Sequence, residues 1–238
     1  MSTPAEVFDP LENHLLAALP DADYRRLRQE LQPAPLSLGQ VVYESGQELD
    51  HVYFPTSCVV SLLYTMRDGS TAEMGLTGKD GMVGVALFLG GNTTPNRAVA
   101  QIAGMTFRMR ADVLQDECAR VGRLHRLMLL YTQALITQIS QTAVCNRLHT
   151  IEKRLCRWLL LSHDRVQADE LPMTQEFIAN MLGGRRESVT VAAGRLQEAG
   201  LIHYARGRIA IVDRKGLEAS VCECYQVVKD ETDRLARE

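Results

Sequence analysis

The chain has 238 residues, of which 46% are hydrophobic and 23% charged, so it suits one large globular domain or two modest ones. Its apolar runs are shorter than the ~20 residues that a membrane-spanning helix requires, and the acidic start, with Glu6, Asp9 and Glu12, does not resemble a signal peptide. Six cysteines without the dense spacing of a disulfide framework favour a reducing compartment. We therefore expect a cytoplasmic protein that does not bind membranes.

Charge is distributed unevenly along the chain, although the net charge is only −3. It is −6 over residues 1–120, +3 over 121–149, +3 over 150–217 and −3 over 218–238. Phosphate contacts supply much of the affinity of nucleic-acid binding, so a polyanion would dock on the positive part of the chain.

The first 110 residues predict short helices followed by a β domain. Residues 1–31 show a leucine stripe, interrupted at Pro20, that is typical of two short helices. β-branched and aromatic runs then alternate with glycine-containing turns, and the expected strands are 41–43, 52–54, 59–64 and 105–109. Several short strands at this spacing indicate a sandwich, barrel or roll.

A long helix is predicted after Ala111, with a hinge at 146–149. Six of its residues recur alternately four and three positions apart, as in the seam of a coiled coil. They are Leu124, Met128, Tyr131, Leu135, Gln138 and Thr142. Because the helix is apolar on two faces, we expect one face to pack on the β domain and the seam to pair with a second copy. The alternative is a single buried helix inside a monomer.

Residues 173–211 predict two helices either side of a tight turn, followed by a hairpin. Thr174 is a good N-cap for the first helix, Gly183-Gly184 breaks it, and the second helix runs from Arg185 to the C-terminal glycine Gly200. The run 202–211 alternates around Gly207 as a two-stranded wing. A helix is expected before this unit over 151–163, a loop over 164–172, and a last helix over 217–238.

This arrangement suits a helix that lies in the major groove of DNA. The start of the second helix carries Arg185, Arg186, Glu187 and Ser188, and the wing adds Arg206 and Arg208. Arginine grips guanine with two hydrogen bonds, glutamate accepts from cytosine, and serine binds phosphate. The alternative is an ordinary helical hairpin with a solvated arginine face.

The order of these parts resembles the Crp/Fnr family of bacterial transcription regulators, most closely over 174–212. The resemblance implies an α+β fold with a cyclic-nucleotide-binding-like β-roll and N-terminal helices over 1–120, a dimerisation helix and hinge over 121–148, and a winged helix-turn-helix with a C-terminal helix over 149–238. The family's base-reading Arg-Glu pair falls on Arg186 and Glu187, and its phosphate-contacting hydroxyls fall on Ser188 and Thr174.

The effector pocket departs from the family's cyclic-nucleotide binders, which carry Gly-Glu and then Arg followed by Ser or Thr. Here Gly84 is followed by Val85, and Arg97 is followed by Ala98. Of the two adenine-contacting positions on the long helix, only Ser140 is polar. A buried phosphate with so few partners is costly, so we expect weak or absent cAMP binding.

No resident metal or cofactor is expected. Oxygen-sensing relatives use N-terminal cysteines, and residues 1–30 contain none. We interpret Cys58, Cys118, Cys145 and Cys156 as packed small hydrophobes, and four iron–sulfur ligands cannot be assembled at the usual spacing. A thiol switch at Cys222 or Cys224 and a haem ligand among His125, His149 and His163 remain as alternatives.

The function that we expect is a homodimeric, sequence-specific DNA-binding regulator that recognises an inverted repeat, with RNA polymerase as the partner that the resemblance implies. One alternative is a DNA-binding protein that is independent of ligands or is controlled by a protein partner. Another is a regulator that responds to redox state or to haem. The chain has no P-loop, no Gly-x-Ser-x-Gly and no His-Glu-x-x-His, so no catalytic residues are assigned.

Overall fold

The computed structural model describes residues 8–166 and 168–237. The chain begins with a 3₁₀ turn, η1 (Pro10–Glu12), and the short helices α1 (His14–Ala17) and α2 (Asp21–Arg28). The expectation of short N-terminal helices is confirmed from residue 10 onward, whereas residues 1–7 lie outside the described part. No helix among the described residues combines the length and the apolar character needed to cross a membrane.

The β domain consists of two antiparallel sheets with the orders β1-β7-β3 and β2-β6-β4-β5. Its strands are β1 (Gln32–Leu36), β2 (Val41–Tyr43), β3 (His51–Pro55), β4 (Val59–Thr65), β5 (Thr71–Thr77), β6 (Arg97–Ile102) and β7 (Gly104–Arg110). The short helix α3 (Val85–Phe88) precedes β6. The four predicted strands are present. The pattern did not reveal β1, β5 or β6. Strand β1 contains Pro33 and Pro35 and lies at a sheet edge, where proline is tolerated.

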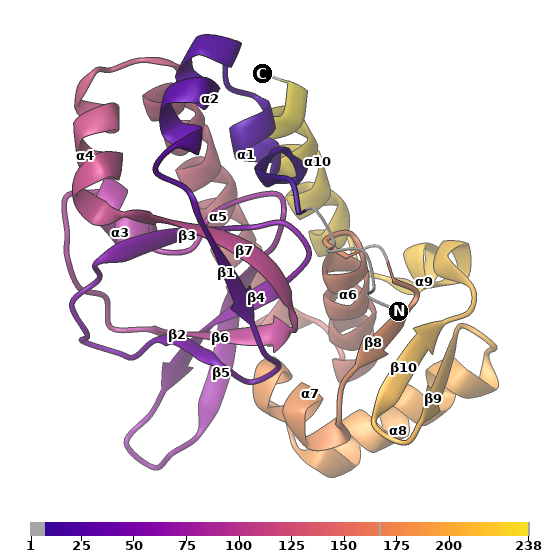
Figure 1. Cartoon of the computed structure of the whole chain (residues 1–238). Coiled ribbons are helices and arrows are strands. Elements are labelled where there is room, and N and C mark those ends of the chain that lie inside the picture. Colours follow the sequence, from indigo (N-terminus) through magenta and orange to yellow (C-terminus); the bar gives the residue numbers. More distant parts are fainter. Residues whose placement is uncertain (1–7, 167, 238) are drawn as a thin grey trace, which may run out of the picture.

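Helices α4 (Ala111–Ala119) and α5 (Arg123–Leu148) follow, and α5 lies against the β domain (Figure 1). The prediction that the seam of α5 faces a second copy needs correction. None of Leu124, Met128, Tyr131, Leu135, Gln138 and Thr142 is more than 8% exposed, because all six face the interior of the single chain.

Hydrogen bonds fix this rotation of α5. The Gln138 amide accepts from the backbone N–H of Leu76 (2.7 Å) and donates to its carbonyl (3.1 Å), which pairs the helix with the edge strand β5. The Tyr131 hydroxyl donates to the carbonyl of Met82 (2.7 Å). The ring reaches this position because residue 81 is glycine, since a Cβ there would lie 2.1 Å from the ring.

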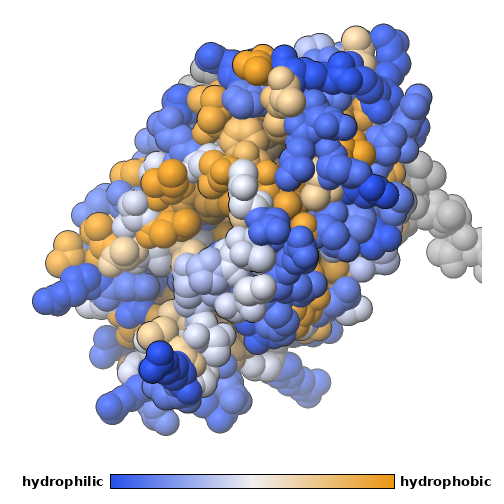
Figure 2. Space-filling model, turned by 90° about the vertical axis from the view of Figure 1, so that its left-hand side faces the viewer, coloured by the Kyte–Doolittle hydropathy of each residue, from blue (hydrophilic) through white to orange (hydrophobic). Residues whose placement is uncertain are grey.

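The opposite face of α5 is apolar and open to solvent. Leu129 is 53% exposed and Ile136 59% exposed, and Ala143 follows at the same seven-residue interval. Figure 2 shows apolar side chains gathered on one face of the molecule between hydrophilic margins. The helix therefore does have two apolar faces, but the face available to a partner is this one.

The C-terminal half begins with α6 (Ile151–His163), followed by β8 (Glu170–Pro172), α7 (Gln175–Leu182), α8 (Arg186–Glu198), β9 (Ile202–Ala205) and β10 (Arg208–Ile211). The wing has three strands in the order β8-β10-β9, so part of the expected loop 164–172 is a strand. The single helix expected over 217–238 is also wrong. It is split into α9 (Arg214–Ser220) and α10 (Cys224–Arg237), and α10 lies along α5 (Figure 1).

One hydrophobic cluster joins the two halves of the chain. Leu63 and Val99 of the β domain pack with Leu155, Trp158 and Leu159 of α6. Within this interface Trp158 Nε1 donates to Glu73 Oε1 (3.0 Å), and Ser61 Oγ lies 2.6 Å from the other carboxylate oxygen. Burial raises the pKa of Glu73 to about 7, against the opposing effect of these hydrogen bonds.

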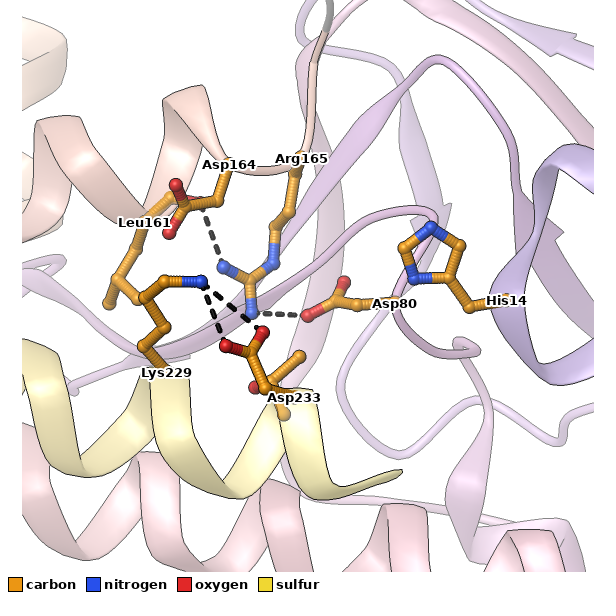
Figure 3. Close-up of a pocket in the computed structure, with 8 residues that line it drawn as sticks. His14, Asp80, Leu161, Asp164, Arg165, Lys229 and Asp233 are labelled. Carbon is orange, nitrogen blue, oxygen red and sulfur yellow. Dashed lines mark hydrogen bonds and ion pairs between the residues drawn. The ribbon is translucent and has the colours of Figure 1, made fainter. Parts of the chain in front are cut away.

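A buried ion pair forms a second link between the halves. Arg165, just after α6, extends its guanidinium toward Asp80 in the loop after β5, at 2.5 Å, and also donates to the carbonyl of Leu161 (Figure 3). The two side chains are 3% and 12% exposed. The contact requires Gly78, because a Cβ there would lie 2.7 Å from Arg165 Cβ.

We predict that Asp80→Ala lowers the free energy of unfolding by roughly 3–5 kcal/mol, because it leaves the buried Arg165 cation without its partner. Denaturant unfolding followed by the fluorescence of Trp158, the single tryptophan, measures the change. The double variant Asp80→Ala/Arg165→Met should be less destabilised than Asp80→Ala. A loss below about 1 kcal/mol in Asp80→Ala would contradict the importance of the pair.

We also predict a pH dependence that Glu73 causes. The folded protein holds the Glu73 proton more tightly than the unfolded chain, so stability from this group is greatest below pH 4.5 and falls as the pH rises to about 7. Glu73→Gln keeps an acceptor for Trp158 and should flatten this part of the curve. Unfolding midpoints measured across that range test the idea, which fails if the parent and the variant run parallel.

Candidate nucleic-acid interface

Helix α7 has the buttressing position expected of the first helix. Thr174 Oγ1 accepts from the backbone N–H of Phe177 (3.1 Å), which confirms the predicted N-cap. Its buried face packs against α8 and β5. The helix ends at Gly183, whose φ of 58° is left-handed and therefore favours glycine.

Helix α8 is the candidate recognition helix. Val189, Ala192, Ala193 and Leu196 are buried as predicted, and Gly200 follows its last turn with a φ of 74°. Thr190 Oγ1 donates to Gln175 Oε1 (2.8 Å), which ties α8 to the start of α7. The small residues on the buried face let α8 pack closely, so its position is set by α6 and α7.

The start of α8 presents polar side chains to solvent. Arg185 is the N-cap residue without a side-chain capping bond, and Arg186, Glu187 and Ser188 form the first turn. All four are exposed, and across the described residues none of their side chains has an ion-pair or hydrogen-bond partner. Two cations, one carboxylate and one hydroxyl are thus available at a helix N-terminus, where the helix dipole also favours a phosphate.

The wing carries two further arginines and lies beside the start of α7. Arg206 and Gly207 both have positive φ, 51° and 76°, as a tight hairpin between β9 and β10 requires. The carbonyl of Gly207 accepts from the backbone N–H of Met173 (2.8 Å), which holds the wing beside the start of α7. Arg206 is exposed at the tip, whereas Arg208 pairs with Glu170 at 3.2 Å.

A second candidate site is an apolar cavity of about 180 Å³ between the β domain and α5. Gly84 and Val85 line it as predicted, and Leu135 and Ile139 close it from α5. Its volume is below the ~300–1,000 Å³ that is usual for small-molecule pockets.

The other residues predicted for this pocket lie elsewhere. Arg97 pairs with Glu44 at 3.2 Å, Ala98 is buried in the core, and Ser140 is exposed on α5, so none of them lines the cavity. Its polar lining instead includes Tyr43, which donates to Asn96 Oδ1 (2.8 Å). Burial raises the pKa of Tyr43, which keeps that hydroxyl protonated. The sequence contains no local signal for this pair, because its members are 53 residues apart.

Two family models match the two halves of the chain. Residues 35–121 match the cyclic nucleotide-binding domain, and residues 153–220 match the Crp-like helix-turn-helix domain. The global nitrogen regulator of Synechococcus elongatus is 25% identical over 210 residues, which cover 84% of this chain and 93% of that protein.

Solved structures show the same fold. FixK2 from Bradyrhizobium japonicum has a TM-score of 0.69 at 17% identity and covers 81% of this chain and 98% of its own. The c-di-GMP-responsive global regulator CLP of Xanthomonas campestris has a TM-score of 0.62 at 16% identity, with 81% and 99% covered. The β-roll, the long helix and the winged helix-turn-helix therefore occur in the expected order, and the chain belongs to the Crp/Fnr family of DNA-binding transcription regulators.

Proposed function

We propose that this regulator acts as a homodimer on an inverted-repeat operator and reads it with the first turn of α8. The observation that supports the proposal is the set of four exposed side chains at that turn, which are without partners in the described chain. Arg186 would grip guanine and Glu187 would accept from cytosine N4. Ser188, Thr174, Arg185 and the wing arginines would contact phosphates.

The exposed stripe of α5 supports the dimer. Leu129, Ile136 and Ala143 recur every seven residues, and Gln133 and Ser140 occupy the neighbouring exposed positions. Two such helices would pack as a short coiled coil. The pairing would set the two recognition helices about one DNA turn apart, ~34 Å, which explains why an inverted repeat is expected.

We also propose that the N-terminal domain does not bind cAMP in the way that is usual for the family. The cavity is small, Arg97 is already paired with Glu44, and glutamate is replaced by Val85 at the cassette position. We therefore expect no micromolar affinity for cAMP or cGMP in isothermal titration, and a measured affinity in that range would overturn this part. The regulator would act in the cytoplasm on RNA polymerase, a partner inferred from the family alone.

Selection of bound fragments from genomic DNA by the purified protein tests the proposal directly. At ~150 mM salt, the selected fragments should share an inverted repeat with half-sites one helical turn apart. Equal retention of random and palindromic duplexes at that salt concentration would exclude sequence-specific reading.

We predict that Arg186→Ala costs about 1–3 kcal/mol of binding free energy at the selected operator and relaxes the preference at one base pair of each half-site. Ser188→Ala, on the same turn, should weaken all sequences more evenly because it removes a phosphate contact. Gel shifts with the operator and with single-base variants separate the two effects. A uniform loss in Arg186→Ala would mean that this arginine contacts only the backbone.

We predict that Ile136→Glu raises the dissociation constant of the dimer at least tenfold, because it places two carboxylates in the helix pair. Met66→Glu is the matched control, since Met66 is 63% exposed on the β4–β5 hairpin. Sedimentation equilibrium of both variants gives the comparison. A dimer that persists in Ile136→Glu, or a parent that is monomeric, would place the interface elsewhere.

A further inference from the structure

The corner between α9 and α10 meets the end of α5 in a cluster of three cysteines and one histidine. Cys145 is in the last turn of α5 and His149 caps that helix, while Cys222 and Cys224 come from the α9–α10 corner. Their ligand atoms all lie within 4.8 Å of one another. The two pairs are more than 70 residues apart in the chain, so no local sequence pattern joins them.

The distances match those between the ligands of one small ion. Cys145 Sγ lies 3.6 Å from Cys222 Sγ, and Cys224 Sγ lies 3.6 Å from His149 Nδ1. A tetrahedral centre with Zn–S bonds of about 2.3 Å and Zn–N bonds of about 2.0–2.1 Å separates its ligand atoms by roughly 3.5–3.8 Å. The four atoms are therefore close to the positions that one ion requires, and little movement is needed to bind it.

The surroundings also suit a metal. The three cysteines are buried and form a small cluster of their own with Val221. The second ring nitrogen of His149 lies 3.6 Å from the Glu223 carboxylate, which would orient the ring in the manner usual for a histidine ligand. Glu223 itself is 78% exposed, so nothing in the fold's interior requires this contact.

We propose that Cys145, His149, Cys222 and Cys224 bind one Zn²⁺ as a closed structural site. Three sulfurs and one imidazole form a ligand set that is typical of structural zinc and leaves no position for a substrate. On binding, each thiol releases its proton to solvent as a Zn–S bond forms, and neutral His149 donates the Nδ1 lone pair. An iron–sulfur cluster fits less well, because its ligands bind different irons and therefore stand farther apart.

The site would fasten the α9–α10 corner to the junction between α5 and α6. The hinge predicted at 146–149 meets this junction only at His149, because α5 continues to Leu148. Beyond the junction, α6 packs against α8. A bound ion would therefore restrict the angle between the dimerisation helix and the DNA-binding half. The metal site itself rests on the cluster alone and does not depend on the proposed operator or dimer.

The full-length protein, purified under anaerobic conditions without chelators, should contain one zinc per chain by elemental analysis. Replacement with Co²⁺ should give the intense visible bands of a tetrahedral cobalt–thiolate centre. Cys222→Ser and Cys145→Ser should lose most of the metal, whereas Cys118→Ser, a buried cysteine outside the cluster, should keep it. Glu223→Gln should fold normally and bind Co²⁺ about 10- to 100-fold more weakly.

Three results would overturn the proposal. The first is a parent protein that binds neither zinc nor cobalt while all six thiols react after unfolding. The second is full metal content in both Cys222→Ser and Glu223→Gln, which would place the ion elsewhere. The third is a Cys145–Cys222 disulfide or an iron–sulfur absorbance in fresh anaerobic protein. If the serine variants do not fold, the affinity of Glu223→Gln for Co²⁺ decides the matter.

Discussion

The contact of Gln138 with the edge strand β5 determines the rotation of α5, and much of the molecule follows from it. A buried amide must find partners, and Leu76 offers both a donor and an acceptor at the edge of the sheet. The same pair of bonds satisfies backbone groups that an edge strand would otherwise leave open. With this face turned inward, Leu129 and Ile136 must point outward.

The inward face of α5 also connects the cavity to the rest of the protein. Leu135 and Ile139 belong both to this helix and to the cavity wall. A ligand that prefers one placement of these side chains would therefore favour one position of α5. The helix leads directly into α6, and α6 supports the recognition helix, so the route from the cavity to the DNA-reading turn consists of packed elements.

Contacts between the two halves of the chain fix the position of α6 on the β domain. A hydrophobic cluster, the Glu73 network within it and the Asp80–Arg165 pair hold α6 on the β domain. Such polar contacts add little net stability compared with apolar packing, but their geometry is demanding. They permit few orientations of the DNA-binding half, and the proposed zinc site would add a further restraint at the junction between α5 and α6.

Features that depend on local chemistry could be predicted from the order of the amino acids. The cap at Thr174, the glycines at 183 and 200, and the wing around Gly207 follow from backbone preferences and hydrophobic periodicity, and all are present. The family pattern identified the β-roll and the order of the domains. It also located the arginines at the start of α8, which are exposed as expected.

Features that depend on residues far apart in the chain could not be predicted from local patterns. Periodicity showed two apolar faces on α5 but could not assign them, because the hydrogen bonds that do so come from Leu76 and Met82. Arg97 pairs with Glu44 and does not line the expected pocket. The packing of α10 on α5 brings Cys222 and Cys224 next to Cys145 and His149. Local patterns report the propensity of a segment, whereas partners across the fold are chosen by how the segments pack.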